Sequence, residues 1–153
     1  MQLTQLLHVD HIRVPLRAQT KEAAIEELVG VLDEAGQLSD PAAVRDAVLE
    51  RESTRTTGIG DGLAIPHGKT DAVDHLVLAL GKAGNPLDFG AIDGKPVNLV
   101  WLLSSPTSKT GPHIEALAAI SKLMAKATVR KAMVEATTPE GILEVLREAE
   151  SEA

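Results

Sequence analysis

Two short and nearly continuous apolar runs constrain the fold of this chain more than any other feature of its sequence. Residues 76–80 and 97–103 are almost entirely apolar. Runs of this length fit strands, and strands without polar alternation are covered on both faces, as in a sheet packed between helices. The sequence therefore predicts an α/β domain with a central sheet and helices on both faces.

Amphipathic segments around these runs supply the expected helices. Thr20 is a suitable N-cap and Gly36 a suitable stop for the first helix, and Pro41 suits the first turn of the second. In the helix after Pro112, the spacing places Ile114 and Leu117 on the apolar face. The expected helices span residues 20–35, 39 or 40 to 52, 113–124, 129–136 and 140–149.

The remaining segments read as turns. Glycines and a proline exclude a helix over residues 55–68, which predicts turns around one short apolar stretch at 63–65. Residues 84–96 are also turn-rich, with a tight turn at Asp93-Gly94. Because neither a repeat nor a linker divides the chain, we expect one domain over residues 1–153. The small and acidic residues 148–153 are expected to form a frayed tail.

Composition excludes several classes of function. The chain of 153 residues has a net charge of −7, no cysteine and 1% aromatic residues. Without cysteine there are no disulfides, zinc-thiolate sites or cysteine nucleophiles. Acidic charge and missing aromatic platforms argue against nucleic-acid binding. Residues 1–13 lack the features of a signal peptide and no apolar run approaches membrane-spanning length, so we expect a cytoplasmic protein without membrane insertion.

Five histidines are the main candidates for a nucleophile or a metal ligand, and their sequence contexts differ. His8 and His11 lie in an N-terminal segment that is expected to be exposed. Their i, i+3 spacing could hold a metal, but solvated surface histidines are the simpler interpretation. His75 precedes an apolar strand and is interpreted as an edge or loop residue.

His67 is held by its neighbours in the chain. Pro66 restricts the backbone before it, Gly68 frees the backbone after it, and three glycines lie just upstream. The plain alternative is a histidine that happens to fall in a turn. Cations and hydroxyls lie close in sequence and are the groups that a phosphate on a histidine would need. These groups are Arg51, Arg55, Thr56, Thr57 and Lys69.

His113 opens an apolar helix after a polar loop that follows a buried strand. Strand-end loops are where ligands bind in open α/β sheets, although an ordinary first-turn helix residue is the plain alternative. No tight ligand cluster supports a zinc site made from His67, His113 and Glu115. The glycines at 58–62 match neither a dinucleotide loop nor a P-loop, and no nucleophile elbow of a serine hydrolase is present.

One family resemblance joins these features. Arg51-Glu52, the segment TGIGDGLAIPHGK at 57–69, FGAIDGKPVNLVWLL at 89–103, Pro106 and the segment HIEALAAIS at 113–121 are similar to EIIA type-2 domains of the bacterial phosphoenolpyruvate-dependent phosphotransferase system. The sequence around His67 most resembles the nitrogen-regulatory branch of this family. Two departures, Ile114 where leucine is common and Trp101 where phenylalanine is common, leave the chemistry untouched.

The resemblance implies a mixed sheet with helices on both faces and a phosphorylatable histidine near the sheet edge. His67 would accept a phosphoryl group from a phospho-HPr-type protein, with His113 beside it and Arg51 offsetting the charge. Thr56, Thr57 and Lys69 are candidate phosphate-binding residues, and no cofactor or metal is expected. The output would be nitrogen or metabolic regulation through target proteins. Two alternatives stay open: a fructose- or mannitol-type EIIA that passes phosphate to an EIIB/EIIC permease, and a non-catalytic binding module.

Overall fold

The strand β6 (Val97–Ser105) lies at the centre of a mixed six-stranded sheet, in a computed structural model that describes residues 1–152. It pairs antiparallel with β5 (Val77–Leu87) and, on its other side, parallel with β3 (Leu63–Ala64) and β4 (His67–Lys69). The path through the sheet is β1-β5-β6-β3-β2, and β4 also pairs with β6. The short strands are β1 (Ile12–Leu16), β2 (Gly58–Gly60), β3 (Leu63–Ala64) and β4 (His67–Lys69).

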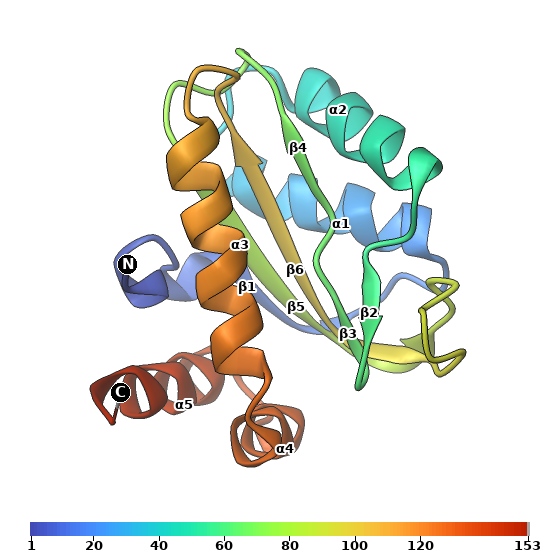
Figure 1. Cartoon of the computed structure of the whole chain (residues 1–153), viewed down its shortest axis with the longest axis vertical. Helices are drawn as coiled ribbons and strands as arrows, with labels where there is room; N and C mark the ends of the chain where they lie inside the picture. Colours follow the sequence, from blue (N-terminus) through green and yellow to red (C-terminus); the bar gives the residue numbers. More distant parts are fainter. Residues whose placement is uncertain (153) are drawn as a thin grey trace.

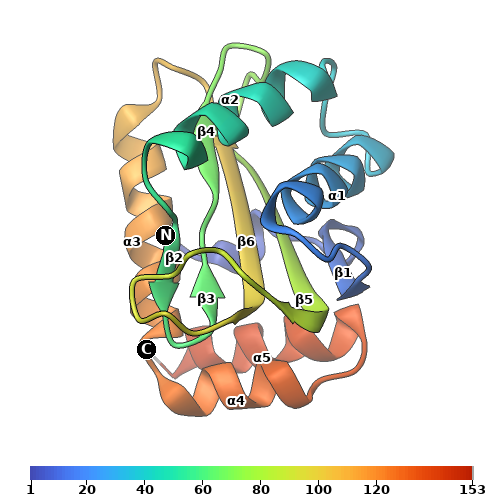
Figure 2. The same cartoon turned by 90° about the vertical axis from the view of Figure 1, so that its right-hand side faces the viewer.

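Helices cover both faces of this sheet, as the apolar runs predict (Figures 1 and 2). One face packs against α1 (Lys21–Glu34) and α2 (Pro41–Thr54). The other packs against α3 (Thr110–Met124), α4 (Ala127–Glu135) and α5 (Pro139–Ser151), together with the 3-10 turns η1 (Leu3–Gln5) and η2 (Val9–His11).

Alternation along β6 divides the core into two layers. Side chains of successive strand residues point to opposite faces. Leu99, Trp101 and Leu103 belong to the layer under α3 and α5, whereas Val100 and Leu102 belong to the layer under α1 and α2. This is why the run lacks polar alternation: both faces of β6 are buried.

Local signals explain where the helices begin. The hydroxyl of Thr20 accepts a hydrogen bond from the Ala23 N–H at 3.1 Å, and the Asp40 carboxylate accepts one from the Ala43 N–H at 3.1 Å, with Pro41 in the first turn. Such caps satisfy backbone donors that have no partner within the helix. The third helix begins at Thr110, earlier than predicted, because Pro112 is tolerated in a first turn.

Three expectations about extended structure differ from the fold. The strand β1 forms where no strand was predicted, and β5 continues to Leu87 through residues predicted as turns. Residues 58–69 contain no helix, as expected, but form three short strands. Long-range pairing holds β1 on β5 and both β3 and β4 on β6, and β2 then pairs with β3. Local sequence does not report the long-range partners. The tight turn does form, since the Gly94 N–H donates to the Ala91 carbonyl at 2.9 Å.

Two further predictions are corrected, the apolar face of α3 and the frayed tail at residues 148–153. In α3 the buried side is made by His113, Ala116 and Ile120, while Ile114 is 59% exposed. The expected frayed tail is helical as far as Ser151, because the Glu150 carboxylate accepts hydrogen bonds from the backbone N–H groups of residues 3 and 4. Residue 153 lies outside the described residues.

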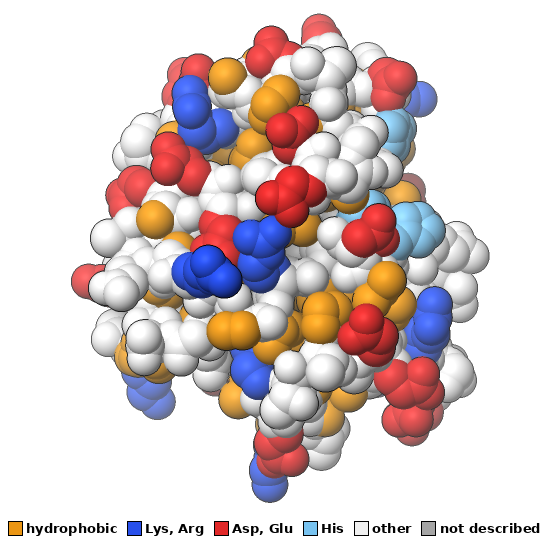
Figure 3. Space-filling view, turned by 180° about the vertical axis from the view of Figure 1, so that it is seen from behind, with side chains coloured by type: hydrophobic (Ala, Val, Ile, Leu, Met, Phe, Trp, Pro, Cys, Tyr) orange, Lys and Arg blue, Asp and Glu red, His pale blue; other side chains and the backbone are white. Residues whose placement is uncertain are grey.

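Two surface properties bear on function. Acidic and basic side chains are interspersed on the face seen in Figure 3, so this face presents no continuous basic patch. Among residues 1–152, no helix combines the length and apolar character that crossing a membrane requires.

Candidate functional site

A cleft of about 510 Å³ brings together four of the site residues that the sequence singled out from distant segments. His67, His113, Arg51 and Lys69 all line it. Sequence reasoning missed Thr54, which follows Arg51 by one helical turn and would have been found by that i, i+3 spacing on α2. The other lining residues are Ala47, Glu50, Gly68 and Leu117.

The strand β4 packs against α2 and pairs with β6, and it carries His67. His67 pairs with Leu103 of β6, and Gly68 pairs with Ser104. A Cβ atom at Gly68 would lie 2.9 Å from the carbonyl carbon of Ala47, so only glycine allows α2 to approach this closely. This contact sets α2 over β4 (Figure 2), and Arg51 of α2 lines the same cleft as His67.

One hydrogen bond assigns the ring protons of His67. Its Nδ1 lies 2.8 Å from the carbonyl oxygen of Ile65. Because a carbonyl can only accept, Nδ1 carries the proton and Nε2 keeps its lone pair in the neutral ring. Burial lowers the pKa of His67, and Arg51 and Lys69 lower it further, against the opposing effects of the Ile65 bond and Glu52. The neutral ring is therefore favoured, with a nucleophilic Nε2.

His113 lies in the first turn of α3 and faces His67. Its backbone N–H donates to the Lys109 carbonyl at 3.0 Å, and its Nδ1 lies 2.5 Å from the hydroxyl oxygen of Ser105. The ring centroids of His67 and His113 are 5.5 Å apart, with the planes at 60°. Burial lowers the pKa of His113 to about 4, so this ring is also neutral near pH 7.

Two cationic side chains, Arg51 and Lys69, line the same cleft and have N–H groups without a hydrogen-bond partner among the described residues. Arg51 Nη1 lies 3.3 Å from the Thr54 hydroxyl and 3.4 Å from the Arg55 carbonyl oxygen. Lys69 Nζ donates to the Thr110 hydroxyl at 3.2 Å. A guanidinium has five N–H groups and an ammonium three, so both side chains retain donors for an anion.

The expected phosphate-binding threonines lie elsewhere. Neither Thr56 nor Thr57 lines the cleft, and Arg55 is absent from its lining as well. The Thr56 hydroxyl donates to the Phe89 carbonyl at 2.5 Å. Thr57 is buried, with its N–H and hydroxyl both donating to the Glu52 carboxylate at 2.9 and 2.5 Å. These hydroxyls anchor the loop after α2, a role that only the tertiary structure shows.

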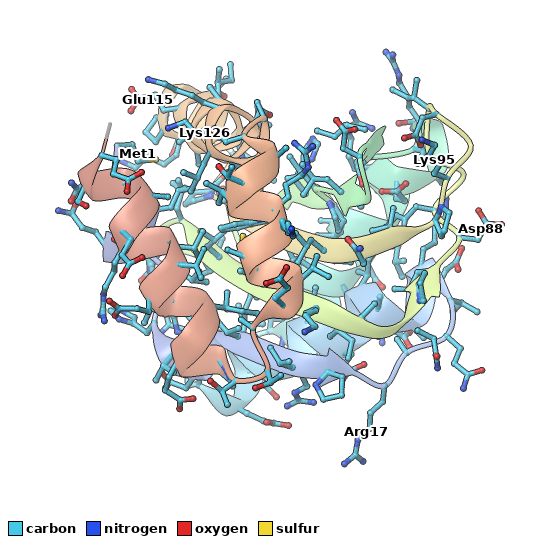
Figure 4. The ribbon with its side chains drawn as sticks, turned by 90° about the horizontal axis from the view of Figure 1, so that it is seen from below. Met1, Arg17, Asp88, Lys95, Glu115 and Lys126 are labelled. Carbon is cyan, nitrogen blue, oxygen red and sulfur yellow. The ribbon has the colours of Figure 1, made fainter. Side chains whose placement is uncertain are left out.

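The other candidates do not join this cleft. His75 is exposed and lies 2.5 Å from the neighbouring Asp74 carboxylate. Glu115, labelled in Figure 4, is exposed and does not line the cleft. Within the part of the chain that the structure describes, no group of three or more His, Cys, Asp or Glu residues could hold a metal ion. A separate cavity of about 280 Å³ lies at the far side of α3, beside Met1 and Lys126 (Figure 4), and contains no histidine.

The N-terminal histidines are not the solvated pair that was expected. His8 is exposed, but His11 is only 3% exposed. The apolar side chains of residues 3, 7 and 12 around η2 pack into the core layer under α5, and this packing carries His11 inward.

The assembled cleft can therefore receive an anionic electrophile. It offers an unprotonated imidazole nitrogen as nucleophile, a second neutral imidazole beside it, and two cations to offset negative charge. A phosphoryl group meets these requirements.

Comparison with known proteins agrees with this chemistry. Residues 5–149 match the family model described as "Phosphoenolpyruvate-dependent sugar phosphotransferase system, EIIA 2". A fructose-specific EIIABC component of Bacillus subtilis is 36% identical over 97% of this chain, which spans only 23% of the length of that relative. A nitrogen regulatory protein of Bradyrhizobium diazoefficiens is 33% identical over 95% of each chain. The crystal structure of the nitrogen regulatory protein IIA-Ntr from Neisseria meningitidis superimposes with a TM-score of 0.86 at 30% identity, covering 94% of this chain and 98% of that one.

Proposed function

This chain belongs to the EIIA type-2 family of the phosphoenolpyruvate-dependent sugar phosphotransferase system, and from that premise we propose that Nε2 of His67 is its phosphoryl acceptor. As a member it is a phosphotransferase component. The observation that carries the proposal is the hydrogen bond from Nδ1 of His67 to the Ile65 carbonyl. This bond leaves Nε2 as the ring nitrogen with a free lone pair.

The proposed transfer needs no group beyond the two proteins. The Nε2 lone pair attacks the phosphorus of a phosphohistidine on an HPr-type donor. The new N–P bond forms as the bond from phosphorus to the donor nitrogen breaks, and that electron pair leaves with the donor imidazole. The proton on Nδ1 of His67 stays on that nitrogen, hydrogen-bonded to the Ile65 carbonyl, and positioning and charge stabilisation supply the catalysis.

Three neighbours of His67 support the phosphoryl group in this proposal. Arg51 offsets its charge with N–H groups that the Thr54 and Arg55 contacts leave free. Lys69 adds a second positive charge from β4, and His113 hydrogen-bonds a phosphoryl oxygen. Thr54 lines the cleft where Thr56 and Thr57 do not, but its hydroxyl donates to the Arg51 carbonyl at 2.8 Å and accepts from Arg51 Nη1, so it supports the Arg51 side chain.

A phosphorylation assay tests the acceptor. Incubation with labelled phosphoenolpyruvate, enzyme I and HPr should place an acid-labile phosphate on the wild-type chain, and His67→Ala should lose it. His75→Ala is the matched control, because His75 is exposed and lies outside the cleft. Undiminished labelling of His67→Ala would refute the assignment of the acceptor.

We further propose that the output is regulatory, as in the relatives named nitrogen regulatory proteins. The specific alternative is transfer to a sugar permease, which the 36% identity to a fructose-specific component favours. Phosphorylated protein mixed with a fructose-type EIIB domain separates the two: rapid loss of label to EIIB supports the permease role, and retention supports regulation. A non-catalytic module is disfavoured by the assembled cleft, and wild-type chain that takes up no label would favour it.

A further inference from the structure

Two adjacent serines end the central strand, and only one of them has a partner. Ser104 and Ser105 are both 0% exposed. By the alternation along β6, Ser105 lies on the same face as Trp101 and Leu103, toward α3, and Ser104 lies on the face toward α2. The Ser105 hydroxyl is 2.5 Å from Nδ1 of His113, whereas the Ser104 hydroxyl has no hydrogen-bond partner among the described residues.

The direction of the Ser105 bond follows from satisfying each polar group. If Nδ1 of His113 donated its proton, the buried Ser105 O–H would have no acceptor among residues 1–152, because its only hydrogen bond there is the one to His113. A buried donor without a partner is costly. If the Ser105 O–H donates, one bond satisfies both the hydroxyl and Nδ1. The proton of the neutral His113 ring then sits on Nε2.

We propose that Ser105 is a positioning residue that fixes His113 as the tautomer with its proton on Nε2, ready to donate to the phosphoryl group. The proposal rests on the proposed function of His67. The two facing rings then carry opposite tautomers, each set by an oxygen on its Nδ1. The Ile65 carbonyl holds the proton of His67 on Nδ1, so Nε2 of His67 keeps its lone pair. The Ser105 hydroxyl donates to Nδ1 of His113, so Nε2 of His113 carries the proton and can donate it in a hydrogen bond.

The strand β6 contacts both histidines and so fixes their relative positions. Leu103 pairs with His67, and Ser105, two residues further on, holds His113. A single rigid strand therefore places the nucleophile and the donor, so that neither ring has to reorganise when the phosphoryl group arrives.

Nitrogen-15 NMR of the histidine rings tests the tautomer without any phosphate donor. In wild type near pH 7 we expect His113 protonated on Nε2 and His67 protonated on Nδ1. Ser105→Ala should shift His113 to a mixture of tautomers while His67 stays unchanged. Transfer from phospho-HPr should slow about tenfold, the effect of losing one ordinary hydrogen bond. Ser105→Thr, which keeps the hydroxyl, should restore both readouts.

Ser104→Ala is the matched control, because it removes an equally buried hydroxyl from the same strand without removing a hydrogen bond. It should leave the tautomers and the rate within about twofold of wild type. Two results would overturn the proposal: wild-type His113 protonated on Nδ1, or Ser105→Ala that matches Ser104→Ala in both tautomer and rate. The wild-type spectrum decides even if Ser105→Ala does not fold. A wild-type chain with the expected tautomers that takes up no label would refute the proposed function and leave the Ser105 assignment standing.

Discussion

Two pairs of histidines meet edge to face in this molecule, and their ring geometry is nearly the same. His67 and His113 have centroids 5.5 Å apart with planes at 60°, while His8 and His11 are 5.2 Å apart at 75°. One pair comes from distant segments joined through β6, and the other from a single turn of η2.

The surroundings separate the two pairs. His67 and His113 open onto a cleft with Arg51 and Lys69, and an oxygen lies within hydrogen-bond distance of Nδ1 in each ring. In the other pair, His11 is buried and its Nδ1 accepts the backbone N–H of His8 at 3.4 Å. Proximity of two histidine rings therefore does not by itself make an anion-binding site. Such a site also needs cations and a cleft that a ligand can enter.

The largest expected contrast comes from His113. Replacing it with alanine removes a donor to the phosphoryl group, so transfer from phospho-HPr should slow about a hundredfold, as on loss of one transition-state donor. The rate is measured per folded molecule, with folding monitored by circular dichroism. A change of less than about twofold would show that His113 takes no part in transfer.

The corresponding change in the other pair should affect stability and not transfer. His11→Ala deletes a buried ring and leaves the His8 N–H unpaired, which should lower the free energy of unfolding by about 1–3 kcal/mol. Urea denaturation measures this effect, and the transfer rate of the folded protein should equal that of wild type. Slower transfer in His11→Ala would join the two pairs functionally and break the comparison.

Acid should act on both pairs. Burial lowers the pKa values of His11, His67 and His113, so the folded chain binds fewer protons than the unfolded chain below pH 6.5. Their stabilising contributions are complete above pH 6.5 and fall as the pH drops, for His113 down to about pH 4. The loss is at most about 1.4 kcal/mol per pH unit for each ring. The free energy of unfolding, measured by denaturation at several pH values in this range, should fall less steeply with decreasing pH for His113→Gln than for wild type. An equally steep fall in His113→Gln would contradict the lowered pKa of His113.

The smallest effect is expected at His8. Its alanine variant keeps the backbone N–H that His11 accepts and loses only an exposed ring, so the free energy of unfolding should change by no more than about 0.5 kcal/mol. Urea denaturation of His8→Ala beside His11→Ala makes the measurement. A loss comparable with that of His11→Ala would mean that the ring contact itself stabilises η2.

Much of the fold was accessible from local sequence. The apolar runs predicted the buried strands because β6 is covered on both faces, and Thr20 and Asp40 marked helix starts because capping depends on a few adjacent residues. Local constraint also singled out His67, since Pro66 and Gly68 flank it in the chain.

Other features depended on partners far away in sequence. β1, β3 and β4 form because β5 and β6 accept them, and α3 turns Ile114 outward because His113 faces Ser105 instead. Thr57 resembled a phosphate ligand by position, yet Glu52 takes both its donors.

The sequence by itself determined the helices and the two buried strands, how the sheet is covered and which histidine the backbone constrains, because each depends on patterning or steric limits within a few residues. Only the tertiary structure decided that His113 faces His67 and that Ile65 and Ser105 contact their Nδ1 atoms. The reason is physical: a tautomer is set by the oxygen that packing brings to a ring nitrogen, and the register of β4 on β6 sets that packing here.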